Sequence, residues 1–143
     1  MRTMLTLIVD AFVFGLLTIT TPSTGVAGKP MDETAFKQLL VKNSPWRVMW
    51  NNSFYDGTFK ISFAVADDNV TGEFFENSGG RLNSPLKNIV IHDNQCVSFI
   101  SGTEKTEYDY CLQESGALTG TQVYTSNLGD TSKGITTALP RRR

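Results

Sequence analysis

The side chains best suited to chemistry are His92 and Asp93, which are neighbours in the sequence, and two cysteines, Cys96 and Cys111. A His–Asp pair that contacts a Ser is the arrangement that activates a nucleophile in many hydrolases. Successive residues of a strand point to opposite faces, so we expect a surface His92 and no triad around it. The chain holds a single His, which excludes a multi-histidine metal site, and the sequence predicts neither a metal nor a cofactor.

Acidic side chains gather around one expected hairpin, at Glu104, Glu107, Asp109 and Glu114. A pair of carboxylates flanking a cleft is the machinery of glycoside hydrolysis. The sequence predicts no cleft here, and Glu107 and Asp109 are expected on the outer face of a sheet. A short turn explains residues 67–69 (Asp-Asp-Asn) better than a calcium loop, which needs a longer pattern of ligands. We therefore expect a protein that is not an enzyme.

The two cysteines fit one antiparallel hairpin. With a turn centred on residues 103–104, Cys96 faces Cys111 directly, and Val97 faces Tyr110 on the opposite side of the sheet. In an oxidising compartment such a pair persists as a disulfide, and closing a loop of about 15 residues stabilises a fold by about 3 kcal/mol. In a reducing compartment two free thiols are expected instead.

The segment 1–28 has the features of a secretion signal. Arg2 precedes a mostly apolar run over residues 5–19, and small residues around Ala27 suit cleavage. Asp10 interrupts the apolar run, so the alternatives are an uncleaved anchor and a buried N-terminal helix. The run is shorter than the roughly 20 residues of a spanning helix. We expect cleavage, a periplasmic or extracellular location, and no stable membrane anchor after cleavage.

The net charge of −1 hides an uneven distribution. Residues 30–128 carry seven basic and twelve acidic side chains, whereas residues 129–143 carry four basic and one acidic and end in Arg141-Arg142-Arg143. The acidic balance of the first segment argues against nucleic acid as a partner. Three terminal arginines contribute about 3 kcal/mol at an acidic membrane, too little for a stable anchor, and the sequence predicts a solvated tail.

The periodicity predicts a short helix followed by a series of strands. Apolar residues within 32–42 recur at helical spacing, and Pro45 ends the helix because the residue before a proline avoids helical angles. From Trp46 onward apolar and polar residues alternate in about seven short segments, which is typical of an all-β barrel or sandwich. We predict an antiparallel meander of seven to eight strands, with one β-barrel domain at 29–126 and a disordered basic tail at 127–143.

Aromatic residues on the expected inward face are the candidates for binding a ligand. Trp50, Tyr108, Tyr110 and Tyr124 are predicted to point into the barrel, and Gln122 shares the face of Tyr124. A polar amide on an apolar face needs a partner or water, which favours a wet cavity over a sealed core. The alternatives are that the aromatic residues serve core packing and that the face of Gln122 points outward.

The helix, the position of Trp46 at the start of the first strand and the meander of hairpins resemble calycin-type barrels, the lipocalin and avidin group. Residues 56–58 (Asp-Gly-Thr) and 115–120 (Ser-Gly-Ala-Leu-Thr-Gly) also resemble segments of small secreted bacterial β-barrel proteins. The resemblance covers about residues 31–126. It implies a small barrel that binds a ligand in its mouth without catalysis.

Two classes of function follow. The first is a secreted binding protein that holds a small apolar or aromatic ligand, or a short glycan, in the barrel. The second is an interaction module, such as an inhibitor of a secreted hydrolase or an envelope component, whose acidic hairpin around Glu107 and Asp109 faces a basic partner. A cavity lined by Trp50, Tyr108 and Tyr124 favours the first class, and a fully packed interior favours the second.

Overall fold

The computed structural model describes residues 31–50, 59–76, 82–101 and 105–142. Within them one helix precedes nine antiparallel strands, which confirms the all-β fold class and slightly raises the predicted strand count. The elements are α1 Glu33–Lys42, β1 Trp46–Trp50, β2 Lys60–Ala66, β3 Asn69–Glu76, β4 Leu82–Pro85, β5 Lys87–His92, β6 Cys96–Ile100, β7 Thr106–Leu112, β8 Leu118–Thr125 and β9 Thr131–Leu139.

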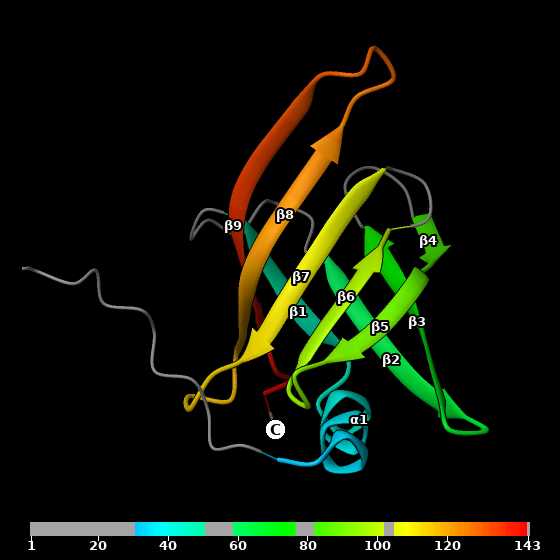
Figure 1. Cartoon of the computed structure of the whole chain (residues 1–143), viewed down its shortest axis with the longest axis vertical. Coiled ribbons are helices and arrows are strands. Elements are labelled where there is room, and N and C mark those ends of the chain that lie inside the picture. Colours follow the sequence, from blue (N-terminus) through cyan, green and yellow to red (C-terminus); the bar gives the residue numbers. More distant parts are fainter. Residues whose placement is uncertain (1–30, 51–58, 77–81, 102–104, 143) are drawn as a thin grey trace, which may run out of the picture.

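The strands curl into a nearly closed barrel, with α1 at one end (Figure 1). Their order is β4-β3-β2-β1-β9-β8-β7-β6-β5. The two edge strands of the sheet, β4 and β5, are therefore consecutive in the sequence. Leu86 joins these two edges, and its N–H donates to the Gly72 C=O of β3 at 2.9 Å. No ladder pairs β4 with β5 in the described residues. The connection through Leu86 therefore brings these two edge strands together.

The helix forms and packs as its sequence predicts. Asp32 caps its start, because the carboxylate accepts a hydrogen bond from the Ala35 N–H at 2.7 Å. Phe36 and Leu40 are fully buried in the same core cluster as Trp46. The Trp46 indole N–H donates to the Leu40 C=O at 2.9 Å. This contact fixes the last turn of α1 against the first strand.

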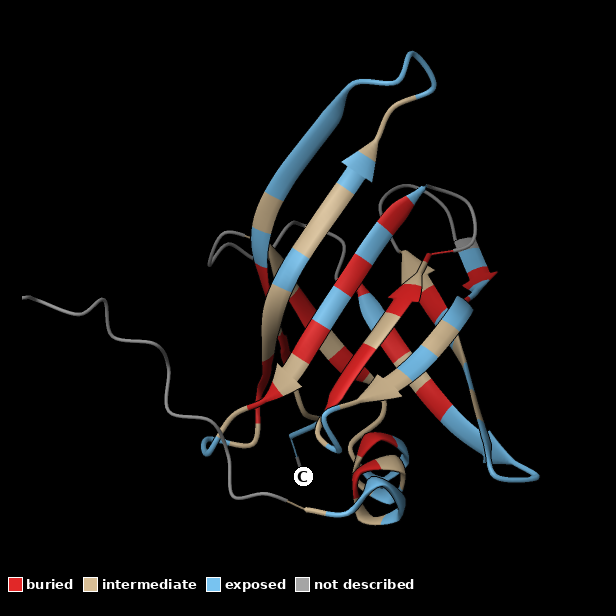
Figure 2. Ribbon diagram, viewed as in Figure 1, coloured by how far each residue is buried: buried red, intermediate tan, exposed pale blue. Residues whose placement is uncertain are grey.

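Aromatic rings form much of the barrel core. Buried residues alternate with exposed or half-buried ones along β7 (Figure 2). Phe99 and Tyr108 stack with ring centroids 5.2 Å apart, and Phe63 meets the edge of Phe99 at 5.9 Å. Such pairs contribute beyond the apolar area that they bury. The buried core residues include Phe36, Leu40, Trp46, Val48, Ile61, Phe63, Phe74, Val97, Phe99, Tyr108, Tyr110, Leu112, Leu118 and Ala138.

The prediction of a disordered tail at 127–143 is wrong, because this segment contains β9. This strand pairs with both β8 and β1 and is therefore central to the sheet. Its inward positions include Gly134, Thr136 and Ala138, which are small, so the strand lacks the apolar alternation that marks the others. The β-barrel domain consequently extends beyond the predicted boundary at residue 126 to the end of β9.

Several predictions fall on parts of the chain outside the described residues. These are the secretion signal at 1–28, the Asp-Gly-Thr segment at 56–58 and the turn centred on 103–104. In the portion that is described, no helix has the length and apolar character needed to cross a membrane.

Candidate functional site

The predicted cysteine pairing is confirmed. Cys96 on β6 and Cys111 on β7 are direct partners in the ladder and form a disulfide, with their Cα atoms 4.1 Å apart. Val97 faces Tyr110 in the same ladder, and both are completely buried. The register therefore matches the predicted hairpin, and the disulfide lies on the opposite side of the sheet from the aromatic core.

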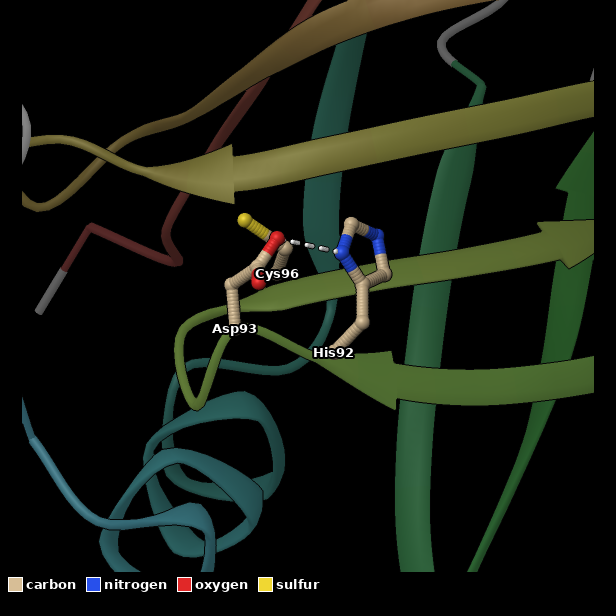
Figure 3. A group of neighbouring side chains, drawn as sticks. All are labelled: His92, Asp93 and Cys96. Carbon is tan, nitrogen blue, oxygen red and sulfur yellow. Dashed lines mark hydrogen bonds and ion pairs between the residues drawn. The ribbon is translucent and has the colours of Figure 1, made fainter.

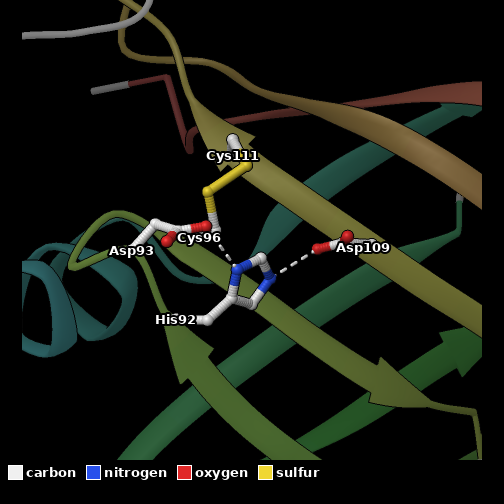
Figure 4. A network of polar contacts seen from close by, with 5 residues as sticks. All are labelled: His92, Asp93, Cys96, Asp109 and Cys111. Atoms are coloured by element: carbon white, nitrogen blue, oxygen red, sulfur yellow. Dashed lines mark hydrogen bonds and ion pairs between the residues drawn. A yellow bond between two sulfur atoms is a disulfide. The ribbon is translucent and has the colours of Figure 1, made fainter.

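Beside the disulfide, His92 contacts two carboxylates (Figure 4). Its Nδ1 lies 3.0 Å from Asp93 Oδ2, and its Nε2 lies 2.7 Å from Asp109 Oδ1. Hydrogen bonds to Asp93 and Asp109, opposed by a smaller effect of burial, raise the pKa of His92 above 6.5. Both ring nitrogens can donate only when the imidazole is protonated, so the two carboxylates favour the charged form.

The contact between His92 and Asp93 corrects the expectation that the two side chains diverge. Asp93 lies in the turn after β5 with φ of 51°, outside strand geometry, and its carboxylate turns back to the imidazole. Asp109 comes from β7, two ladders away, and extends the contact across the sheet surface. With a carboxylate at each ring nitrogen, His92 is not placed to accept a proton from a serine as a triad requires.

The same region brings three metal-ligating residue types together (Figure 3). Ligand atoms of His92, Asp93 and Cys96 lie within 4.8 Å of one another. The Cys96 sulfur is bonded to Cys111 and offers no thiolate. The oxidised protein thus presents only the imidazole and one carboxylate of this group, too few for a structural zinc site.

Glu107 and Asp109 lie on the outer face of β7, as predicted. They line a hollow of about 360 Å³ together with Ser98 and Thr121, whereas the sequence indicated no concavity here. Asp109 is engaged by His92, and Glu107 faces Ile100 on β6. The hollow is therefore not flanked by two equivalent free carboxylates of the kind that glycoside hydrolysis requires.

The predicted ligand residues converge on the inner face of the barrel. Tyr108 and Gln122 are partners in the β7–β8 ladder, and Tyr124 lies one inward position further along β8. Tyr108 is 3% exposed, whereas Tyr124 is 40% exposed at the rim. The Gln122 Oε1 atom is buried and has no hydrogen-bond partner among the described residues. The face predicted for Gln122 is therefore the inward one.

Trp50 connects to these residues through two phenylalanines that the prediction did not include in the site. Its ring lies 4.3 Å from that of Phe59, centroid to centroid, and Phe59 lies 5.8 Å from Phe74. Phe74 then stacks on Tyr108 at 5.9 Å. Trp50, Phe59, Phe74 and Tyr108 together form what we call the aromatic wall. Phe59 shares the alternating pattern of the second strand, which was the only sequence signal for its inward position.

Tyr110 lies deeper than the other predicted ligand residues. It is fully buried, and its hydroxyl is 2.7 Å from Thr136 Oγ1. Burial raises the pKa of Tyr110 well above its usual 10. Its ring packs 5.8 Å from that of Tyr108. Tyr110 therefore supports the aromatic wall from within the core. Trp50, Gln122 and Tyr124 are more accessible than Tyr110.

Comparisons of the chain with protein-family models, with curated proteins and with solved structures return no match.

Proposed function

We propose that the protein is an exported, non-enzymatic binding protein that holds a small aromatic or apolar ligand against the aromatic wall of a calycin-like barrel. The observation that carries this proposal is the Gln122 Oε1 atom, which is buried beside Tyr108 and has no hydrogen-bond partner in the part of the chain that the structure describes. A buried acceptor of this kind costs free energy unless a donor reaches it. A ligand with an N–H or O–H group supplies that donor.

The surroundings of Gln122 suit such a ligand. The aromatic wall offers ring faces for stacking, and Trp50 at one end of it is only partly buried. Tyr124 at the rim presents an amphipathic side chain to solvent. A site built from apolar rings and one fixed polar group is the usual composition of a small-molecule pocket. The same combination also accommodates one face of a sugar ring.

The disulfide supports the proposed location. Cys96 and Cys111 are joined, and disulfides persist in oxidising compartments. The disulfide is therefore consistent with a periplasmic or extracellular protein that binds its ligand outside the cytoplasm.

The proposal is tested by titrating the oxidised protein with 1-aminoanthracene, a fluorescent aromatic amine whose N–H matches the Gln122 acceptor. We expect saturable binding and quenching of the tryptophan fluorescence. Gln122→Met keeps the side-chain length but removes the acceptor, and should weaken binding about fivefold to tenfold, the worth of one hydrogen bond. Gln38→Met, on the exposed face of α1, is the matched control and should leave the affinity unchanged.

Native mass spectrometry of the protein from its own source provides a second measurement. A co-purifying small molecule identifies the natural ligand, and a saccharide would assign the site to glycans. Failure of 1-aminoanthracene to bind, together with the absence of any co-purifying molecule, would overturn the proposal.

A second candidate, an interaction module, is favoured by the β8–β9 hairpin, which extends beyond the other strands (Figure 1). Leu128 at its tip is 91% exposed. The Ser126 Oγ accepts hydrogen bonds from the Leu128 and Asp130 N–H groups, at 3.2 and 3.1 Å, which holds the tip in shape. An apolar anchor on a rigid support suits insertion into a partner's pocket. Leu128→Asp should abolish binding of a secreted partner, whereas Asn127→Asp at the same tip should retain it.

A further inference from the structure

A basic hollow lies at the α1 end of the barrel. It has a volume of about 450 Å³ and contains four cationic side chains, those of Arg47, Lys60, Arg141 and Arg142. Leu139 contributes an apolar wall, and none of the described residues that line the hollow has a carboxylate side chain. The folded domain is otherwise acidic, so the hollow is a local reversal of charge. We call these four cationic residues and Leu139 the basic hollow.

The fold itself brings these charges together. Arg47 on β1 and Lys60 on β2 are direct partners in the ladder, and Arg47 is also the partner of Leu139 on β9. The ladder thus places two cationic side chains that line the hollow on neighbouring strands.

The C-terminal arginines are held at the hollow by the backbone. The Arg141 N–H donates to the C=O of Asn43, at the end of α1, at 3.1 Å. Arg141 and Arg142 follow directly from β9 and line a concave surface, so this segment is not the predicted disordered tail. Both side chains are exposed, in agreement with the prediction that the terminal arginines are solvated. Arg143 lies outside the described residues.

Three of the cations form no ion pair with another described residue. The ion pairs seen in the described part of the chain involve Lys37 with Glu33 and His92 with its two carboxylates. Lys60, Arg141 and Arg142 take part in none of them and are solvent-exposed. Their charges are available to a ligand.

We propose that the basic hollow binds a small soluble phosphorylated anion that carries two or more negative charges. Guanidinium groups match phosphate oxygens in a bidentate manner, and Arg141 and Arg142 supply two of them beside Lys60. The volume lies within the range of small-molecule sites. Leu139 offers an apolar surface to the organic part of the ligand. The site is separate from the aromatic wall and does not depend on the function proposed above.

Isothermal titration of the oxidised full-length chain with inorganic tripolyphosphate tests the proposal. We expect one saturable site whose affinity falls as the salt concentration rises. Lys60→Gln with Arg142→Gln removes two exposed charges and should weaken binding at least tenfold, since hydrogen bonds to charged groups are the strong ones. Lys133→Gln removes one exposed charge from β9 outside the hollow and should change the affinity less than twofold.

Circular dichroism of each variant checks that it remains folded. Absence of tripolyphosphate binding, or equal weakening by Lys133→Gln, would overturn the proposal, because the latter would show a non-specific charge effect. Sedimentation with phosphatidylglycerol vesicles separates the two sources of phosphate. Binding to these vesicles without binding to tripolyphosphate would overturn the soluble ligand and assign the hollow to a lipid headgroup.

Discussion

The Tyr110 hydroxyl lies 2.7 Å from Thr136 Oγ1, so a side chain of β7 reaches past β8 to β9. Thr136 Oγ1 in turn donates to the Met49 C=O of β1 at 3.1 Å, which makes Tyr110 the donor to Thr136. Gly120 on β8 is the ladder partner of both Tyr110 and Thr136. Two consecutive hydrogen bonds thus tie three strands together beneath the aromatic wall.

Replacing the Thr136 hydroxyl in this pair of hydrogen bonds should cost more stability than removing the Tyr110 hydroxyl. Tyr110→Phe loses one hydrogen bond, worth about 1 kcal/mol, and leaves Thr136 bonded to Met49. Thr136→Val leaves the buried Tyr110 hydroxyl without its acceptor, which should lower the free energy of unfolding by about 2–3 kcal/mol. Urea unfolding at pH 7 measures both. Equal losses in the two variants would contradict the direction of the hydrogen bonds.

The raised pKa of Tyr110 predicts a loss of stability in alkali. In the unfolded chain this hydroxyl ionises near pH 10, whereas burial keeps it protonated in the fold. The folded state therefore holds the proton more tightly, and its advantage diminishes as the pH rises beyond 10. Between pH 9 and pH 11 the urea midpoint should fall less in Tyr110→Phe than in the wild type. Parallel slopes would show that Tyr110 is not the group responsible.

Gly120 is required by the close approach of β7 and β8. A Cβ atom at this position would overlap the carbonyl group of Asp109 on β7. Gly120→Ala should therefore force the strands apart and destabilise the fold by about 1–3 kcal/mol, as measured by thermal unfolding. Thr119→Ala, on the outward face of the same strand, is the control and should have a much smaller effect. Equal stability of Gly120→Ala and wild type would refute the overlap.

The disulfide should account for a substantial part of the stability. Cys96→Ser with Cys111→Ser opens a loop of 15 residues and should lower the free energy of unfolding by about 3 kcal/mol. Dithiothreitol should destabilise the wild type by a similar amount and leave the double variant unaffected. A reductant effect of the same size on both proteins would mean that the bond is not the cause.

The parts of the fold that were predictable depend on local patterns. Alternation and turn position were enough to pair Cys96 with Cys111 and to place Tyr108 inside, because the side-chain period of a strand fixes both once one turn is located. The cap at Asp32 and the end of the helix before Pro45 follow equally local rules.

The remainder depends on contacts between distant strands. β9 was not predicted because its inward side chains are small. The tyrosines of β7 fill the interior at these positions, and Thr136, for example, lies beneath Tyr110. Without β9 the terminal arginines could not be placed beside Arg47. The contact of His92 with Asp109 likewise requires the combined register of β5, β6 and β7. Its contact with Asp93 requires a turn residue at positive φ.

The single His makes the last prediction directly measurable. Because hydrogen bonds to Asp93 and then Asp109 raise the pKa of His92, the folded state favours the protonated imidazole. The stabilisation is fully present below pH 6.5 and is lost as the pH rises through the higher pKa of the folded protein.

In a proton NMR titration, the one histidine Hε1 signal should have its midpoint above pH 6.5 in the wild type. Asp93→Asn and Asp109→Asn should each move the midpoint down, because each replaces a carboxylate with a neutral amide at one ring nitrogen. Glu107→Gln removes a carboxylate from the same strand face as Asp109 without touching a hydrogen bond of His92, and should move the midpoint far less. A midpoint that responds equally to all three variants would indicate the general charge of the sheet surface and not the two contacts.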